Sequence, residues 1–376
     1  MDAGNPREGH TFEGWYADKE YTTPWNFNNA ITSNTKIWAK WIATVTSVSI
    51  SPNTTQTKNL NCTKIEQITF TATADNATDY EWYVDDVMQG ETSNTFNFTT
   101  PAGNGAYVIY AKATNMYTAT PPTSTSVTVT VTRCATVNSS LTATPYNGKL
   151  KFMCYNLGAN PIKTIDEQMA YAPTGDSDAT VFGDLYQWGR RADGHEKRTS
   201  ARYPTNDASS ESGAVSGANL DATGQVINTH SAFGKFIKNN ANPFDWRTPQ
   251  TETLWNRDTE AAPVKTTNDP CPDGWRVPTK AEWASILSPT NTWTETNVGT
   301  KGHKVSTDGG LTYDLFIPAA GGRMYTTGGL TGVGLYGYYW SSTPNGILAY
   351  GLYSNPFSTN GYVRTYGFSV RCVAEH

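Results

Sequence analysis

The chain has 376 residues, of which only 16% are charged, and its net charge is −5. This length predicts two or three domains, and the mild charge without a basic stripe argues against nucleic acid as a partner. No run of about 18 apolar residues occurs, so we expect no membrane-spanning segment in this chain. Thr, Asn, Ser and Gly replace charged residues, a mixture typical of β-strands joined by polar turns.

Residues 1–42 form the first predicted unit, a small β module. The stretches GHTFEGWY, WNF and IWAKW resemble the Listeria–Bacteroides repeat of bacterial surface proteins, with the first strand of the repeat truncated. In that family the module acts as a spacer or adhesive stalk, and a spacer is the role we expect. Because the opening residues read as the middle of a folded unit, we expect a longer precursor, so the absence of a visible signal says little about location.

Residues 43–135 form the second predicted unit. The runs QITFTATA, YEWYVDD, NTFNFTT, AYVIYAKATN and SVTVTVTRC alternate apolar and polar residues with the period of a half-buried strand. Trp82 in YEWYV resembles the buried tryptophan of immunoglobulin-like sandwiches. The unit therefore resembles the Ig-like or PKD-like modules of cell-surface proteins.

Residues 136–376 form the third predicted unit, which has short helices among many loops. KAEWASIL (Lys280 to Leu287) reads as a helix with Thr279 as its N-cap. SAFGKFIKNN (Ser231 to Asn240) reads as a second helix with one apolar face. Large aromatic side chains should supply much of the core. These are Trp188, Trp246, Trp255, Trp275, Trp283, Trp293 and Trp340.

Several stretches between about residues 145 and 376 resemble the major paralogous domain of Fibrobacter and Bacteroides-type bacteria. They are KFMCYNLGA, LYQWGR, DPCPDGWRVPTKAEWASIL, LFIPAAGGR, GYYWSST and YGFSVRCVAE. The resemblance implies an α+β C-type lectin-like domain, so the expected fold class is multidomain and mainly β. The same scaffold displays the variable regions of diversity-generating retroelements, which lie at the C-terminus and end in a fixed motif like GFSVRCV.

The segment 330–366 has the composition of a binding loop. Tyr, Ser, Asn and Gly make up more than half of it, and Arg364 is its only charged residue. Tyrosine offers a large, rigid contact, and the small polar residues offer adaptable hydrogen bonds. Trp340, Gly367 and Cys372 should belong to the supporting framework. The predicted ligand-binding residues are Tyr336, Tyr338, Asn345, Ile347, Leu348, Tyr350, Tyr353, Asn355, Phe357, Tyr362, Val363, Thr365 and Tyr366. The alternative is that these residues are ordinary core strands of the fold.

The five cysteines suggest two disulfides. We expect Cys62 to pair with Cys134 and Cys271 with Cys372, because each pair brackets one block of the chain, and this leaves Cys154 over. Such bridges imply an oxidising compartment. The alternative is five reduced, buried thiols.

Catalytic and metal-binding patterns are not found, so we expect no cofactor, no metal and no enzymatic activity. No histidine lies at metal-ligand spacing, and no cysteine has an adjacent activating His or Lys. The acidic stretch 175–184 lacks the spacing of a calcium-binding EF-hand loop, so a solvated turn is expected there. The Glu-Pro-Asn and Trp-Asn-Asp sugar-binding motifs of lectins do not occur, which argues against calcium-dependent sugar binding.

Together these observations predict a cell-surface or secreted ligand-binding protein. Its ligand would be an unknown protein or glycan on another cell or a phage, and its binding face could be diversified by a retroelement. The alternative is a structural protein of the cell envelope or a pilus that has no specific ligand.

Overall fold

The computed structural model describes residues 7, 9–28, 30–62, 65–101, 105–161, 163–205, 212–287, 291–296, 299–354 and 357–375. The protein is multidomain and mainly β, as predicted. It divides into two compact units. Unit 1 comprises Met1–Lys58, Ile65–Pro101 and Gly105–Thr132, and unit 2 comprises Asn59–Lys64, Ala102–Asn104 and Arg133–His376.

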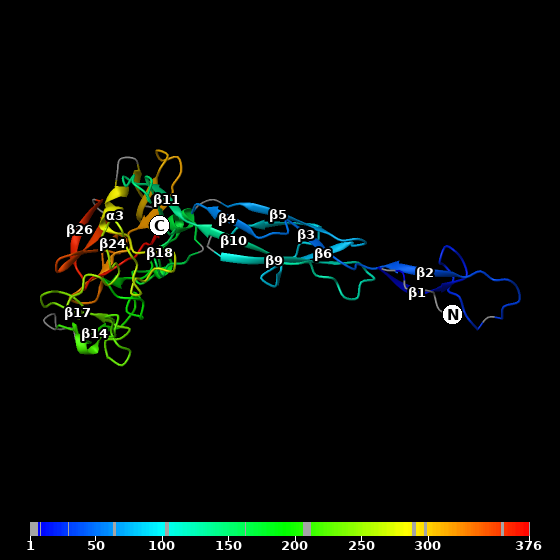
Figure 1. Ribbon diagram of the computed structural model, residues 1–376, viewed down its shortest axis with the longest axis horizontal. Helices are drawn as coiled ribbons and strands as arrows, with labels where there is room; N and C mark the ends of the chain where they lie inside the picture. Colours follow the sequence, from blue (N-terminus) through cyan, green and yellow to red (C-terminus); the bar gives the residue numbers. More distant parts are fainter. Residues whose placement is uncertain are drawn as a thin grey trace. The chain divides into compact units, whose positions relative to one another are not determined.

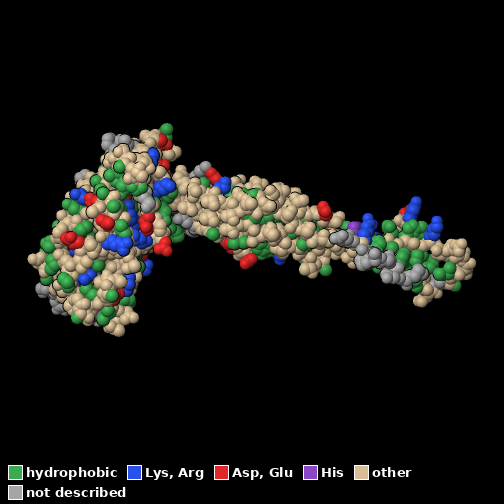
Figure 2. Space-filling view, in the orientation of Figure 1, with side chains coloured by type: hydrophobic (Ala, Val, Ile, Leu, Met, Phe, Trp, Pro, Cys, Tyr) green, Lys and Arg blue, Asp and Glu red, His purple; other side chains and the backbone are tan. Residues whose placement is uncertain are grey.

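Unit 1 begins with an aromatic hairpin. Strands β1 (His10–Tyr16) and β2 (Trp38–Ala43) pair antiparallel, with Phe12 opposite Trp41. The ring of Phe12 lies 5.3 Å from that of Trp41 and 5.7 Å from that of Trp15. None of the described residues from 7 to 44 is buried, and Figure 2 shows hydrophobic and Lys side chains exposed on this hairpin. Its stability therefore depends on cross-strand aromatic pairs rather than on a closed core.

The rest of unit 1 is a β-sandwich. One sheet contains β3 (Ser49–Ser51), β5 (Gln67–Thr73) and β8 (Thr95–Thr99). The other has the order β4 (Gln56–Leu60), β10 (Val127–Arg133), β9 (Gly105–Thr114), β6 (Asp79–Val84) and β7 (Val87–Met88). The predicted period-two runs form β5, β6, β8, β9 and β10. Trp82 is fully buried between the sheets, with its ring 6.5 Å from that of Phe70 and its Nε1–H donating to the carbonyl of Ser93.

Unit 2 is built from several short sheets. A four-stranded sheet has the order β11 (Ala135–Asn138), β12 (Lys149–Phe152), β28 (Val373–Ala374) and β18 (Trp275–Arg276). A second has the order β13 (Tyr186–Gln187), β27 (Gly367–Phe368), β22 (Gly322–Arg323) and β23 (Leu330–Thr331). A third sheet joins β19 (Thr292–Thr296), β20 (Gly302–Ser306) and β21 (Leu315–Pro318). Parallel pairs join β14 (Arg202–Tyr203) to β16 (Phe236–Ile237), and β15 (Val215–Ser216) to β17 (Arg247–Thr248).

The C-terminal sheet of unit 2 contains β24 (Tyr338–Asn345), β25 (Leu348–Ser354) and β26 (Phe357–Val363). Helix α3 (Lys280–Ile286) packs against all three strands (Figure 1). The other helices are α1 (Ile165–Ala170), α2 (Ala179–Phe182) and the 3₁₀ turn η1 (Gly217–Asn219). Helix α3 begins as predicted, because Thr279 and Glu282 form a reciprocal capping box.

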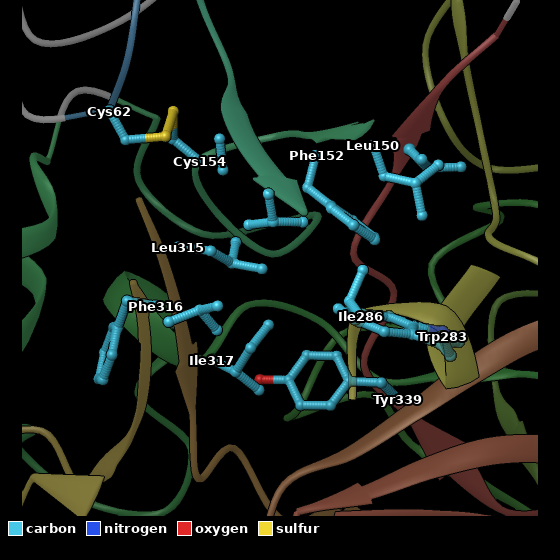
Figure 3. Close-up of a cluster of buried hydrophobic side chains, with 14 of the residues drawn as sticks. Cys62, Leu150, Phe152, Cys154, Trp283, Ile286, Leu315, Phe316, Ile317 and Tyr339 are labelled. Atoms are coloured by element: carbon cyan, nitrogen blue, oxygen red, sulfur yellow. A yellow bond between two sulfur atoms is a disulfide. The ribbon is translucent and has the colours of Figure 1, made fainter. Parts of the chain in front are cut away.

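Two hydrophobic clusters fill unit 2, one on each side of the C-terminal sheet. The first contains the Cys62–Cys154 disulfide at one edge and includes side chains of β12, β21 and α3 (Figure 3). In it, the ring of Phe152 stacks on Trp283 at 5.2 Å, and the hydroxyl of Tyr339 donates to the carbonyl of Pro318.

The second cluster contains most of the tryptophans predicted to form the core. Trp188, Trp246, Trp255 and Trp340 belong to it and are fully buried. Each indole N–H donates to a backbone carbonyl, for example that of Trp340 to Tyr186 at 2.7 Å. Trp275 and Trp293 are only half-buried.

The cysteine pairing differs from the prediction in one bridge. Cys271 and Cys372 are joined as predicted, but Cys62 pairs with Cys154, and Cys134 is a free, half-buried thiol. Buried and half-buried residues alternate from residue 131 to residue 137, and Ala135 faces the cluster that contains Cys62. Cys134, which lies between β10 and β11, therefore points away from that cluster.

The helix predicted for residues 231–240 is also wrong. Residues 231–234 form turns, Gly234 has φ +69°, and Phe236 and Ile237 form β16. A left-handed glycine interrupts a helix at that point. Phe236 and Ile237 instead form backbone hydrogen bonds with β14, and both side chains are buried.

Candidate binding surface on the C-terminal sheet

The C-terminal sheet sorts the predicted binding residues onto two faces. Tyr338 lies opposite Tyr353 across β24 and β25, and Tyr353 lies opposite Ser358 across β25 and β26. Directly opposed residues point to the same side of an antiparallel sheet. The neighbouring row, Tyr339 and Leu352, points the other way and is fully buried in the first hydrophobic cluster.

Six half-buried tyrosines form a continuous group, which we call the tyrosine patch. Its members are Tyr325, Tyr336, Tyr338, Tyr353, Tyr362 and Tyr366. Their ring centroids are 4.8 to 6.4 Å apart from one member to the next. The structure thus brings together five of the predicted binding residues and adds Tyr325.

Two fully or nearly fully buried aromatic residues support the patch from below. The ring of Phe368 lies 4.9 Å from Tyr338, 5.0 Å from Tyr362 and 5.1 Å from Tyr366. Trp340 lies 4.5 Å from Phe368 and is held by its hydrogen bond to Tyr186. The tyrosines therefore pack on buried rings that fix their positions. Binding of a ligand would then cost little side-chain conformational entropy.

The patch carries no charge near neutral pH. Burial, reinforced by the neighbouring tyrosines, raises the pKa of Tyr338 to about 12. Burial also raises the pKa of Tyr362 and of Tyr366. These phenols are therefore protonated hydrogen-bond donors at physiological pH.

Arg364, the only charged residue in the segment 330–366, does not reach the surface. Its guanidinium is fully buried and donates to the carbonyls of Gly346, Leu348 and Thr251, and it faces the carboxylate of Asp245 at 3.6 Å. It anchors the β24–β25 turn and contributes no charge to the patch.

Other predicted binding residues lie away from the patch. Tyr350 belongs to the opposite face, where the Lys280 ammonium lies 4.1 Å from its ring. Phe357 shares that face and packs between Trp293 and His303, with ring centroids at 4.1 and 4.4 Å.

Most of the remaining predicted positions lie at the end of the sheet next to the β24–β25 turn. Asn345, Leu348 and Val363 are half-buried and oppose one another across the three strands, while Ile347 is 48% exposed in the turn. The prediction for Thr365 is corrected: this residue is fully buried, and its hydroxyl donates to the carbonyl of Phe244.

Asn355 lies outside the described residues.

The predicted framework motif GFSVRCV ties the segment to the rest of unit 2. Arg371 is fully buried and donates to Asn156 Oδ1 and to the carbonyls of Met153 and Phe316. A side chain on Gly367 would approach Phe236 and Arg323 within 3.0 Å, so only glycine fits there without rearrangement.

One group of potential metal ligands converges among the described residues. The ligand atoms of Asp193, His195 and Glu196 lie within 4.8 Å of one another. His195 uses both ring nitrogens, since Nε2 accepts the Gln187 N–H at 3.1 Å and Nδ1 donates to Asp193 at 2.7 Å. Burial lowers the pKa of His195 to about 4, which keeps it neutral. The arrangement satisfies a buried histidine and leaves it no lone pair for a metal.

The acidic stretch 175–184 is likewise used internally. Asp178 caps α2 by accepting from the Thr180 N–H, and it also accepts from the hydroxyl of Tyr171 and from the N–H of Thr174. Asp184 pairs with Lys197 at 2.7 Å.

Tyr325 and the base under the patch were not predicted from the sequence as parts of the site. Tyr325 precedes β23 in a Thr- and Gly-rich loop, and no periodicity or motif marks it. It reaches the patch only because β22 and β27 are paired, which places its loop beside Tyr366.

Comparisons with known proteins match parts of the chain. Residues 4–40 match the Listeria-Bacteroides repeat domain, which confirms the predicted repeat. A protein of Evansella cellulosilytica named "Putative membrane protein" is 44% identical over 48 residues, which cover 12% of this chain and 7% of that relative. Among solved structures, a chimeric titin Z1Z2 functionalized with a KLER exogenous peptide from decorin matches 24% of this chain and 98% of its own, at 12% identity and a TM-score of 0.18.

The repeat points to a surface-associated protein. None of the helices that the structure describes is both long enough and apolar enough to cross a membrane.

Proposed function

We propose that this chain is a surface-associated binding protein and that unit 2 presents the tyrosine patch to a protein or glycan ligand. The observation that carries the proposal is the patch itself: six half-exposed tyrosines on a buried aromatic base, five of them in the segment 330–366, whose only charged residue is internal. Tyrosine-rich surfaces of this kind are typical of binding hot spots and paratopes. The function is binding without catalysis.

The proposal extends to the scaffold and its variability. The residues that resemble C-type lectin-like and retroelement-variable domains include the motif that holds the segment in place, GFSVRCV. A presenting layer on a fixed support suits an adhesin whose face varies. A structural cell-envelope or pilus protein would have no need of an exposed aromatic group, because such a group risks non-specific association.

Binding to cells tests the function directly. The full chain, fluorescently labelled, is applied to a panel of bacterial and epithelial cells and measured by flow cytometry. The double variant Y336A/Y353A should abolish binding, and circular dichroism should show that it remains folded.

The matched control is Y83A/Y110A in the β-sandwich of unit 1. This pair of half-exposed tyrosines also stacks, at 4.8 Å, but lies in the other unit. Equal binding by both double variants, or no binding to any cell by the unaltered chain, would refute the proposed function.

Variability is tested separately by sequencing the DNA that encodes residues 330–366 across many cells of one strain, with its flanking DNA. Variation at adenines of a nearby template repeat, confined to patch and turn codons and sparing those of Trp340 and Arg364, would support diversification. Uniform codons without a template would refute it and leave a fixed-specificity adhesin.

A further inference from the structure

The two central rings of the tyrosine patch, Tyr338 and Tyr366, pack against other rings of the protein. Tyr338 stacks on Tyr353 at 5.1 Å and 30°, and on Phe368 at 4.9 Å and 17°. Tyr366 stacks on Phe368 at 5.1 Å and 23°, and Tyr325 meets it edge-on at 4.8 Å. Tyr338 thus has two stacked ring partners, and Tyr366 has one stacked and one edge-on partner.

This geometry bears on the class of ligand. A sugar ring that stacks on tyrosine needs a free aromatic face, and the central rings do not offer one. The edge of an aromatic ring carries the positive end of its quadrupole, so it attracts oxygen acceptors such as peptide carbonyls.

The hydroxyls add further donors. Within the described part of the chain, those of Tyr338, Tyr353 and Tyr366 form no hydrogen bond. A half-exposed phenol without an internal partner can donate to a ligand at no cost in broken protein contacts.

The charge of the segment further restricts the class of ligand. The only charged side chain of the segment 330–366, Arg364, is internal. A partner with a strongly charged contact surface would lose its hydration on the five patch tyrosines of this segment and gain no ion pair with the segment in return.

We infer that the ligand of the tyrosine patch is a segment of another protein that offers carbonyl oxygens and uncharged side chains, and that it is not a glycan. This inference rests on the proposed function. Association is expected without electrostatic steering, through edge contacts and phenol hydrogen bonds to exposed backbone.

The test uses the full chain with two probes, a phage-displayed library of random peptides and a printed array of neutral glycans. Selected peptides are resynthesised, and their Kd is measured by biolayer interferometry. We expect sequences poor in Asp, Glu, Lys and Arg, with a Kd that changes less than about twofold between about 50 mM and about 500 mM NaCl.

Single substitutions at Tyr353 separate the hydroxyl from the ring. Tyr353→Phe should raise the peptide Kd by roughly threefold to tenfold, as expected for one hydrogen bond. Tyr353→Ala should raise it by roughly tenfold to a hundredfold, as expected for a hot-spot ring. The Y83A/Y110A control should leave it unchanged.

Three outcomes would overturn the inference. Neutral glycans that bind the chain and are lost in Tyr353→Ala would show that the ligand is a glycan, and the binding function would stand. Selected peptides rich in charged residues, with more than about tenfold salt dependence, would show that the charge argument is wrong. Binders unaffected by Y336A/Y353A would overturn both the inference and the proposed function.

Discussion

The replacement Arg364→Met tests whether the segment's single charge is structural or part of the binding surface. Its guanidinium donates to three carbonyls at 2.7 to 3.1 Å and faces the buried carboxylate of Asp245 at 3.6 Å. Removing one partner of a buried ion pair typically costs about 3–5 kcal/mol, because the other charge is left uncompensated. We expect the free energy of unfolding of unit 2 to fall by about that amount at pH 8.

The loss should depend on pH in a defined direction. Burial, opposed by Arg364, already raises the pKa of Asp245 to about 6, and removal of Arg364 should raise it further. At pH 5 the carboxyl is then protonated, no buried charge is left unpaired, and the loss should be smaller than at pH 8.

Urea unfolding followed by tryptophan fluorescence measures both values. Arg191→Met is the control, because Arg191 is 41% exposed and pairs with Asp221 on the surface, where such pairs contribute about 0–1 kcal/mol. A loss for Arg364→Met that is no larger than the control's, or one that is independent of pH, would refute this account of the buried pair.

Three further predictions concern stability and thiol chemistry. Burial raises the pKa of Asp269 to about 7, so the native state binds one more proton than the unfolded state between about pH 4 and about pH 7. The free energy of unfolding relative to that of Asp269→Asn should therefore fall as the pH rises through this range. Urea unfolding of both proteins measures this difference, and a difference that is independent of pH would contradict the prediction. The double variant C271S/C372S should lose roughly 2–5 kcal/mol of unfolding free energy, since the bridge closes a loop of 101 residues; a shift of under about 1 kcal/mol would be inconsistent with this bridge. A maleimide reagent applied without reductant should label Cys134 alone, as shown by mass spectrometry of peptides; labelling of Cys154 would indicate a different pairing.

Sequence patterns between neighbouring residues were sufficient to predict β10 and the start of α3. The period-two alternation of Val127, Val129 and Val131 is a direct consequence of strand geometry, and it predicts β10 from the sequence. The capping box of Thr279 and Glu282 likewise fixes the start of α3 within one turn. Both patterns involve only residues close in sequence, so no knowledge of the tertiary fold is needed.

The tyrosine patch depends on tertiary pairing and was only partly predictable. Its composition singled out the segment, but the register decides which residues share a face, and β24 shifts register between Trp340 and Pro344. Tyr350 is three residues from Tyr353 on β25, and Phe357 lies opposite Ser354, so both point to the face opposite the patch. The sequence also left the role of Arg364 open, because a lone arginine among tyrosines looks the same in sequence whether it lies at a binding hot spot or inside the fold.

Within residues 330–366, side chains that anchor the segment alternate along the sequence with side chains that form its outer surface. Trp340, Arg364 and Thr365 make their hydrogen bonds to backbone carbonyls far along the chain, at Tyr186, Thr251 and Phe244. Tyr336 and Tyr353 contribute ring contacts to one another and form no side-chain hydrogen bonds with the described residues. The energy that holds the segment in place therefore comes from residues that face inward, while the outward residues are left available to a ligand. A fold arranged in this way can change its contact surface without changing the interactions that keep it folded.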